Sequence, residues 1–506
     1  MRFGPPSPIC FDSFPVVNNP NRGKRHIMAD LKSIPFWDNL RGFQKSAARW
    51  LEHKNGTGLL ADPMGSGKTI EAMTYLALHP ELRPVLVIPP ATVKLKWERE
   101  VKKWMPEEDA QVVFGLSPFK VTGSIIIINW DIIFVGEKVL NHKYVLGESN
   151  KKYVTKYRAR DELADTKWAV IIGDEIHKIS NNAAGRTVAF KQVCKNKKAK
   201  KIVLSGTPIE NRPINFFNIL KILDPKTFMW RKFTIDYCDK KHNGFGWNYN
   251  GSSNTADLHH KVKSVMLRRD KSVILPDLPP LQRTIIPLEL DNKGKYRKAE
   301  KDFIQYLRDH KGNIKAEKAS AALHLARFEG LKQLAVQGII KSVIKWVEDY
   351  LESGEKLVIG CIHRDVNEIL YKKFKGISVQ IIGGISAKAK ESAIYKFQNN
   401  PKIKLAVCNI IAAGEGIDLY AANSTLTIEY LWKPGPHDQF EARVHRIGQE
   451  ADSVNAYYLI AAGTVMEDIA ELIDAKRKEI DAIIDGIITP ETSLITELMK
   501  RYKDGA

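Results

Sequence analysis

Cysteine is scarce in this sequence, and long apolar runs are missing altogether. The five cysteines stand far apart among 506 residues, without a Cys-x-x-Cys pair or a histidine at ligand spacing. We therefore expect neither a zinc module nor a disulfide framework, and a reduced intracellular compartment fits. No apolar run approaches the ~18 residues needed to span a bilayer, and the first residues lack the apolar core of a secretory signal. The cysteines are Cys10, Cys194, Cys238, Cys361 and Cys408.

Acidic residues are too few to balance the basic ones. The sequence has 78 Lys and Arg but 58 Asp and Glu, which gives a formal net charge of +20. A surplus of this size favours a polyanionic partner, and nucleic acid is the simplest one. The hydrophobic share of 44% and the charged share of 27% are ordinary for a folded protein, so wholesale disorder is excluded. At roughly 150 residues per domain, we expect two to four domains.

Two long stretches, 35–213 and 346–464, alternate short apolar runs with helical patterns. The apolar runs are continuous, which is typical of parallel strands buried on both faces. A repeated order of strand and helix predicts an α/β fold with a doubly wound parallel sheet in each stretch. The expected strands are 58–62, 85–89, 124–129, 169–174 and 201–206, then 356–361, 379–384, 404–409, 425–430 and 455–461.

The remaining segments have different patterns. Residues 1–34 show no periodicity and are expected to form an N-terminal tail. Apolar residues at helical spacing in 214–223, 296–309 and 317–351 predict a mostly helical insertion over 214–345. A last helix is expected to begin near Val465 and to pack on the core, within a final segment of 465–506.

A glycine-rich turn follows the first expected strand and opens a helix. Its sequence is DPMGSGKT (62–69), with glycines that let backbone N–H groups point at phosphate oxygens. Lys68 can reach the β- and γ-phosphates of a nucleotide, and the Thr69 hydroxyl can hold Mg²⁺. The strict P-loop pattern has glycine where Asp62 stands. The expected nucleotide-binding residues of this turn are Asp62, Met64, Gly65, Ser66, Gly67, Lys68 and Thr69.

An Asp-Glu pair ends the strand expected at 169–174. The carboxyl end of a parallel strand is where open α/β sheets place their ligands. Asp174 is expected to hold Mg²⁺, and Glu175 to orient and deprotonate an attacking water.

Phosphoryl transfer also needs positive charge on the transition state, which an arginine finger commonly supplies. Arg443 and Arg446 stand three residues apart in the second α/β stretch, so they share one face if this segment is helical. If both reach the nucleotide, ATP must lie between the two α/β units. Its binding and hydrolysis would then close and open a cleft.

Taken together, these motifs resemble those of superfamily 2 helicase-like motors of the SNF2 type. The resemblance covers about 35–485, and R-I-G-Q (446–449) and MLRRDKSVILPDLPP (266–280) are specific to SNF2 proteins. It implies two RecA-like domains with a helical insertion between them. The matching segments are LRGFQKSAARWL (40–51), DPMGSGKT (62–69), VIPPATVKLKWEREV (87–101), INWD (128–131), DEIH (174–177), LSGTPIENRP (204–213), AAGEGIDLYAAN (412–423) and LWKPGPHDQFEARVHRIGQ (431–449).

The resemblance also implies roles for residues that the motifs alone do not explain. Gln44 would contact adenine, Gln439 would lie near the phosphates, and Gly416 and Asp418 would couple the nucleotide to DNA. Members of this family are DNA-stimulated ATPases that move along duplex DNA and use ATP and Mg²⁺. The candidate nucleic-acid contacts are Thr92, Lys94, Asn129, Ser386 and Trp432.

The segment 237–254 resembles the insertion of the annealing-helicase, HepA-related branch, which acts at DNA forks and junctions. The size of the chain implies a minimal motor without accessory domains, in the cytoplasm or nucleoid of a prokaryotic or phage-infected cell, or in the nucleus if the host is a eukaryote. Two alternatives stay open. One is a strand-separating DNA or RNA helicase, and the other is a non-catalytic DNA-binding scaffold on a decayed motor.

Overall fold

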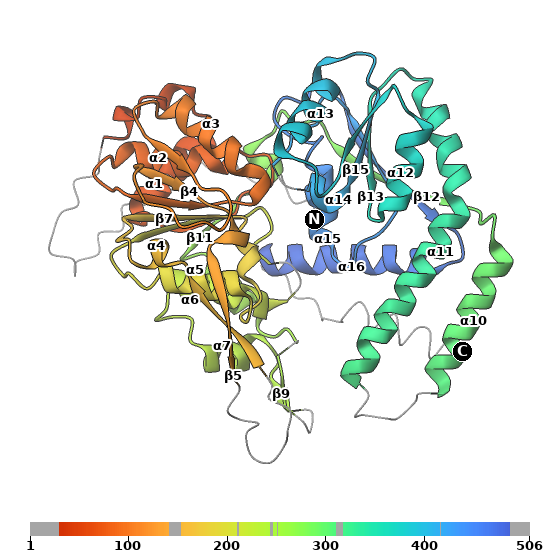
Figure 1. Cartoon of the computed structure of the whole chain (residues 1–506), viewed down its shortest axis with the longest axis horizontal. Helices are drawn as coiled ribbons and strands as arrows, with labels where there is room; N and C mark the ends of the chain where they lie inside the picture. The colour runs from red at the N-terminus through yellow and green to blue at the C-terminus, as the bar shows by residue number, and fades with distance from the viewer. Residues whose placement is uncertain are drawn as a thin grey trace, which may run out of the picture.

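The computed structural model describes residues 30–140, 153–209, 212–242, 246–249, 251–309, 317–414 and 416–485. Two α/β units lie side by side, each with a single parallel sheet flanked by helices (Figure 1). The predicted fold class is confirmed. Most of the expected N-terminal tail and the end of the chain beyond 485 lie outside the described residues. Within the described ranges, none of the helices combines the length and the apolar character needed to cross a membrane.

The first sheet has seven parallel strands in the order β11-β1-β8-β7-β2-β4-β3. Successive residues of a strand belong to different apolar clusters: Leu59 packs in one, and its neighbour Leu60 packs in another. Both faces are therefore buried, as the continuous apolar runs predicted. The strands are β1 (Thr57–Leu60), β2 (Val85–Ile88), β3 (Ala110–Val112), β4 (Ile125–Ile127), β7 (Val170–Asp174), β8 (Lys200–Leu204) and β11 (Met266–Leu267).

Helices cover both faces of this sheet (Figure 1). They are α1 (Gly42–His53), α2 (Lys68–Leu78), α3 (Lys94–Trp104), α4 (Asp161–Ala164), α5 (Gly185–Val193), α6 (Pro213–Leu223), α7 (Trp230–Tyr237), α8 (Thr255–Val262) and α9 (Lys271–Ile274).

The second sheet has six parallel strands in the order β12-β17-β16-β13-β15-β14. The strands are β12 (Leu281–Leu288), β13 (Leu357–Cys361), β14 (Ser378–Ile381), β15 (Leu405–Asn409), β16 (Ser424–Thr427) and β17 (Val454–Ala461). Its helices are α10 (Lys293–Asp309), α11 (Glu317–Leu351), α12 (Arg364–Lys373), α13 (Ala387–Asn399), α14 (Ile410–Ala413), α15 (Pro434–Glu441) and α16 (Val465–Asp485).

The range 214–345, expected as a helical insertion, contains strands as well as helices, and two of them belong to the large sheets. β11 pairs with β1 in the first sheet, whereas β12 pairs with β17 in the second, so the chain crosses between the units after Leu267 and before Leu281. No sequence pattern predicts β12, because this edge strand is largely exposed and contains Pro287, which only an edge tolerates. The proposed domain boundaries stay predictions.

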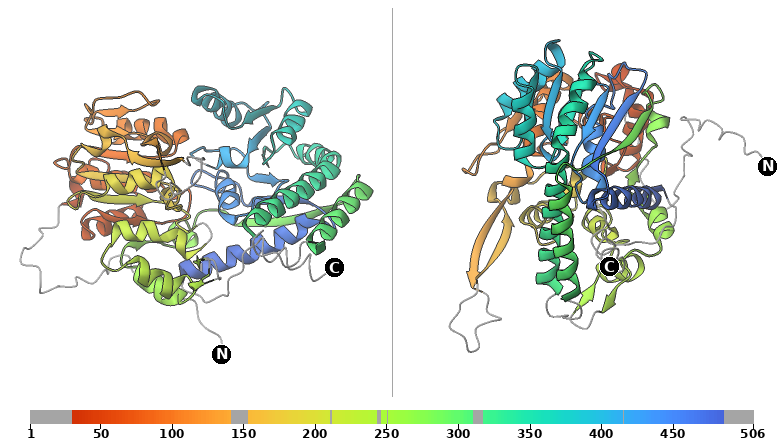
Figure 2. Two further views of the ribbon diagram at one scale, coloured as in Figure 1. Left: turned by 60° about the horizontal axis from the view of Figure 1, so that its bottom comes forward. Right: turned by 90° about the vertical axis from the view of Figure 1, so that its right-hand side faces the viewer.

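An antiparallel hairpin that the sequence did not predict extends from the first unit. Strands β5 (Phe134–Leu140) and β6 (Tyr153–Ala159) pair only with each other, and Figure 2 shows them projecting away from both sheets. A second, much shorter pair is formed by β9 (Lys241–His242) and β10 (Trp247–Asn248).

The second unit is closely packed where its central strand supports α15. A Cβ atom at Gly360 in β13 would lie 2.8 Å from the Phe440 ring and 2.9 Å from Ile410. We predict that Gly360→Ala lowers the free energy of unfolding by about 1–3 kcal/mol through overpacking. Urea denaturation followed by tryptophan fluorescence measures this loss.

Gly330 provides the matched control. It lies inside α11 with open space around its Cα, so Gly330→Ala is expected to stabilise the helix by about 0.5–1 kcal/mol. Equal effects of the two substitutions would contradict the close packing at Gly360.

Candidate functional site

The glycine-rich turn has the backbone conformation that its sequence predicts. Gly65 and Gly67 have φ values of 84° and 90°, in the left-handed region that favours glycine, and α2 begins at the next residue, Lys68. Lys68 Nζ donates to the carbonyl oxygens of Asp62 (2.8 Å) and Pro63 (3.1 Å). Burial lowers the pKa of Lys68, and the nearby carboxylates, first of all Glu175, oppose this shift.

Asp62, which replaces a P-loop glycine, is the buried anchor of an ion pair. Its carboxylate is fully buried and accepts from the Arg269 backbone N–H (3.0 Å) and from the Arg269 guanidinium. Arg269 also lies 3.3 Å from Glu71, another fully buried carboxylate. Burial, and then the charge of Asp62, raises the pKa of Glu71 to about 8. The arginine therefore ties the phosphate turn to the segment after β11.

Gln44 lies beside the same turn. Its Nε2 donates to the Ser66 carbonyl oxygen (3.2 Å), and its Oε1 accepts from the Arg41 backbone N–H (3.0 Å). A Cβ atom at Gly67 would lie only 2.7 Å from Gln44 Nε2, so this glycine permits the close approach.

Asp174 and Glu175 lie together at the carboxyl end of β7. Trp97 Nε1 donates to Asp174 Oδ2 (2.8 Å), and Trp130 Nε1 donates to the Asp174 carbonyl oxygen (2.8 Å). Burial and the charge of Glu175 raise the pKa of Asp174 to about 6. The two carboxylates are thus held side by side at one point of the sheet edge.

Glu175 has an unusual backbone and a histidine beside its carboxylate. Its φ is 51°, a left-handed conformation that is uncommon outside glycine and marks strain at functional sites. Oε2 lies 3.3 Å from His177 Nδ1, which also contacts Ser205 Oγ at 3.1 Å. Burial acts to raise the pKa of Glu175, but His177, Lys68 and Arg443 together lower it to about 2. Glu175 is therefore ionised.

These groups fit a nucleotide and a magnesium ion. The Ser66 hydroxyl is fully buried without a hydrogen-bond partner at the turn, and Lys68 makes its hydrogen bonds to the carbonyls of the turn itself. Thr69 lies in the first turn of α2, and Asp174 offers a carboxylate; hydroxyl and carboxylate oxygens are ligands that Mg²⁺ accepts.

The second unit contributes the opposite wall. Arg446 follows α15, and its Cβ lies 3.0 Å from the position that a Cβ at Gly65 would take. Its Nη1 donates to the Ile417 carbonyl oxygen (3.1 Å) and to the Asp418 carboxylate. Arg446 therefore lies directly against the phosphate turn of the first unit.

Arg443 is buried on the same wall. Its guanidinium donates to the carbonyl oxygens of Gln439 (2.9 Å), Ile417 (3.2 Å) and Gly414 (3.1 Å). Its charge is among those that lower the pKa of Glu175 in the first unit. Gln439 Nε2 contacts Thr207 Oγ1 at 3.4 Å.

Further contacts join the walls on the side of α3. Asp418 pairs with Lys96 at 3.3 Å, and Arg99 pairs with Glu391 of α13. A Cβ atom at Gly416 would lie 2.7 Å from Val93. The structure thus brings the predicted residues of both units to one interface.

Comparison with known proteins decides the family. The model of the SNF2-related domain matches residues 43–334, and that of the helicase conserved C-terminal domain matches 342–448. The chain belongs to the SNF2-related family. It is a helicase-like ATPase, and the predicted resemblance is confirmed.

Relatives of this SNF2-related chain are longer proteins. It is 31% identical over 454 residues to the SWI/SNF-related matrix-associated actin-dependent regulator of chromatin subfamily A-like protein 1 of Xenopus tropicalis, covering 87% of this chain and 44% of that protein. It is 27% identical over 458 residues to the DNA annealing helicase and endonuclease ZRANB3 of Homo sapiens. This match covers 88% of this chain and 40% of that protein. The chain therefore spans less than half the length of these relatives.

Among solved structures, the Sulfolobus solfataricus SWI2/SNF2 ATPase core in complex with dsDNA is similar, at 26% identity and a TM-score of 0.40, covering 90% of this chain and 98% of that chain.

The predicted nucleic-acid residues of this SNF2-related chain lie in different surroundings. Thr92 lines a cleft of about 660 Å³ between α3 and α13, and Trp432 lines another of about 520 Å³. Lys94 is buried, and its Nζ donates to the Val113 carbonyl oxygen (2.8 Å). Asn129 is buried beside Asp131, and Ser386 caps α13 by accepting from the Ala389 N–H. Their contacts with nucleic acid stay predictions.

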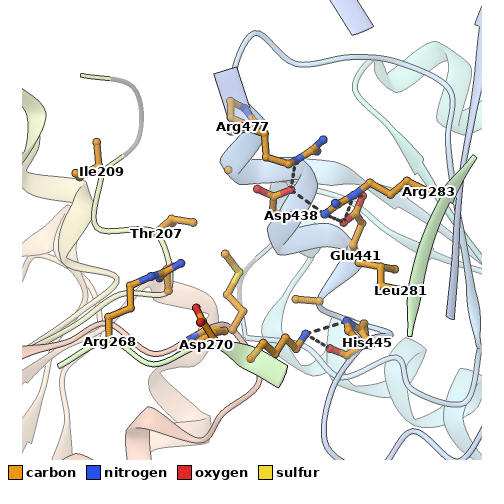
Figure 3. Close-up of a pocket in the computed structure, with 17 residues that line it drawn as sticks. Thr207, Ile209, Arg268, Asp270, Leu281, Arg283, Asp438, Glu441, His445 and Arg477 are labelled. Atoms are coloured by element: carbon orange, nitrogen blue, oxygen red, sulfur yellow. Dashed lines mark hydrogen bonds and ion pairs between the residues drawn. The ribbon is translucent and has the colours of Figure 1, made fainter. Parts of the chain in front are cut away.

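A third cleft, of about 390 Å³, lies between the units next to the phosphate turn (Figure 3). On its second-unit side, Arg283 donates to Glu441 (2.7 Å), and Arg477 of α16 donates to Asp438 (2.8 Å). Figure 3 places Thr207 and Arg268 on the opposite side. None of the residues named on either side of this cleft was predicted to be functional, although Arg268 stands in the SNF2-specific segment 266–280.

The Asp62–Arg269 pair generates a stability prediction. Because Arg269→Ala would leave the Asp62 carboxylate buried without its cation, we expect it to lower the free energy of unfolding by about 3–5 kcal/mol. Urea denaturation measures the change. Adding Asp62→Asn to this variant should recover part of the loss, since the unpaired charge is removed. A loss below about 1 kcal/mol in Arg269→Ala would contradict the importance of this ion pair.

Proposed function

We propose that this SNF2-related chain is an ATP-driven translocase on double-stranded DNA. The observation that carries the proposal is the contact between Arg446 and the phosphate turn, with Arg443 buried on the same wall. A nucleotide held at this interface joins two units through its phosphates. Its hydrolysis then changes how the units bind each other, which is the step that turns chemistry into movement.

The residues of both walls act on the γ-phosphate. The backbone N–H groups of the turn and Lys68 bind the phosphates, while Thr69 and Asp174 hold Mg²⁺, which neutralises phosphate charge when bound. Glu175, ionised and fixed by His177, orients the attacking water and takes its proton. Arg443 and Arg446 stabilise the charge of the transition state after they exchange their present carbonyl and Asp418 partners for phosphate oxygens.

A cationic cleft supports DNA as the partner. The cleft of about 520 Å³ that contains Trp432 is lined by Lys178, Arg186 and Lys433, and no carboxylate is among the described residues of its lining. The two other inter-unit clefts both contain carboxylates. A cleft whose charged lining residues are all cations suits a phosphate backbone. The net charge of +20 agrees with this partner.

The name of one relative favours DNA annealing as an activity of the motor. One of them is named a DNA annealing helicase, and this chain covers 40% of that protein. We therefore propose that the motor anneals or remodels DNA at forks or junctions, or displaces bound protein. A strand-separating helicase is the second candidate. The decayed scaffold is disfavoured because Lys68, Glu175 and Arg446 are all present at one interface.

The role of Glu175 is tested by removing its charge. We predict that Glu175→Gln lowers kcat for ATP by about 10²–10⁴-fold, as loss of a general base does, while ATP and duplex DNA still bind. Coupled-enzyme ATPase assays and fluorescence anisotropy measure the two quantities. Glu368→Gln, on the exposed side of α12, is the matched control and should keep parental turnover. Equal turnover in Glu175→Gln and the parent protein would remove the assignment.

The DNA partner is tested by the ATPase rate with defined nucleic acids. We predict strong stimulation by duplex and forked DNA, weaker stimulation by single-stranded DNA and RNA, and a steep loss of stimulation with salt because phosphate contacts release counterions. Unchanged turnover with and without duplex DNA at low salt would contradict the translocase, and stimulation by RNA alone would favour the second candidate.

A further inference from the structure

The β5–β6 hairpin is firmly attached at its base. The rings of Phe134 and Tyr157 meet edge to face at 5.5 Å, and both lie where a side chain at Gly185 would clash. The Ala159 backbone N–H donates to Gln192 Oε1 (2.6 Å), further along α5. Because the hairpin lies along α5 from Gln192 to Gly185, its outer half extends past the N-terminal end of that helix. It therefore projects as an arm of fixed direction.

The outer half of the arm has no partner strand or sheet among the described residues. A two-stranded hairpin is marginally stable in water by itself, and unpaired strand edges invite association with other chains. This hairpin nevertheless keeps seven residue pairs in register, with Val135 37% exposed and Val154 40% exposed. Such an exposed element is expected to have a partner when the protein works.

Charge identifies the chemistry of that partner. The described strands contain four charged side chains, and three of them are cations: Lys138, Lys156 and Arg158, against Glu137. The register pairs Lys138 with Thr155 on one face. On the other face Lys156 stands opposite Glu137, and Arg158 forms an ion pair with Asp161, two residues after the strand. Cations therefore stand on both faces, and the face of Lys156 also carries valine side chains. This combination suits the sugar-phosphate backbone of a nucleic acid, which has negative phosphates and apolar sugar surface.

The position of the arm agrees with this chemistry. α5, on which the hairpin lies, begins at Gly185, and the next residue, Arg186, lines the acid-free cleft together with Lys178 and Lys433. Figures 1 and 2 show the hairpin and α5 side by side, with the outer end of the hairpin directed away from the body of the protein. Arg186 thus connects the cleft to the helix on which the arm lies.

We propose that the β5–β6 hairpin is a second DNA contact, an arm that binds the phosphate backbone of the duplex outside the inter-unit cleft. This proposal rests on the proposed function, because it takes duplex DNA as the partner. The arm lengthens the contact with DNA on one side of the cleft. It therefore keeps the duplex bound while the two units change their own contacts with it. It does not touch the nucleotide, and ATP hydrolysis without DNA is independent of it.

The test uses the full chain with Lys138→Ser and Lys156→Ser combined. Both side chains are exposed, and neither belongs to the nucleotide site. The affinity for a fluorescein-labelled duplex is measured by anisotropy at several salt concentrations around 0.1 M. We expect weaker binding and a slope of log affinity against log salt that is shallower by about 2, one for each lost phosphate contact, with the DNA-free ATPase rate unchanged.

Two further variants separate charge from structure. Lys138→Arg with Lys156→Arg should restore the parental slope, and Lys372→Ser with Lys375→Ser, exposed lysines of the second unit, should leave it unchanged. If duplex DNA stimulates the parent protein and the serine variant keeps the parental slope, the proposal for the arm is overturned and the proposed function is not. A parent protein whose ATPase ignores duplex DNA would overturn the proposed function. A loss seen with duplex RNA but not with duplex DNA would overturn the choice of partner.

Discussion

The structure depends on one constraint: charged groups are partly or fully buried where the two α/β units meet, and each needs a partner. Arg446 lies against the phosphate turn while its guanidinium is neutralised by Asp418, and Asp418 in turn pairs with Lys96 of the first unit. Such partners are exchangeable, because a γ-phosphate offers the arginines the negative charge that Asp418 and backbone carbonyls supply without it. The interface is therefore built to respond to the phosphates of a nucleotide.

Much of the fold could be predicted because parallel strands buried on both faces have continuous apolar sequences. Every strand expected in 35–213 and 346–464 is present, and α2, α3 and α16 begin close to their expected residues. The sequence pattern did not reveal strands that are buried on only one face or on neither. β12 is a largely exposed edge strand, and the β5–β6 hairpin has mixed polar and apolar residues with much of its surface in water. Local patterns do not distinguish such strands from loops.

The candidate site, like the fold, could be predicted only in part. Lys68, Asp174, Glu175 and Arg446 follow from short motifs, and the fold brings them to one interface. Arg269 was not assigned a role because its partner Asp62 is 207 residues away and only the folded chain shows the pair. Asp62 itself stood out as a departure from the P-loop pattern, and its buried carboxylate gives that departure a physical reason. Long-range pairing of buried charges is the information that a single sequence conceals.

The central claim is that a nucleotide joins the two walls through the arginines of the second unit. The most direct measurement is an experimental structure of the chain with ADP, beryllium fluoride, Mg²⁺ and duplex DNA. The account predicts that the guanidinium groups of Arg443 and Arg446 leave the carbonyls of Gly414 and Ile417 and the Asp418 carboxylate and lie about 3 Å from the fluorides that replace the γ-phosphate. Guanidinium groups that keep their present partners while the nucleotide analogue occupies the turn would contradict it.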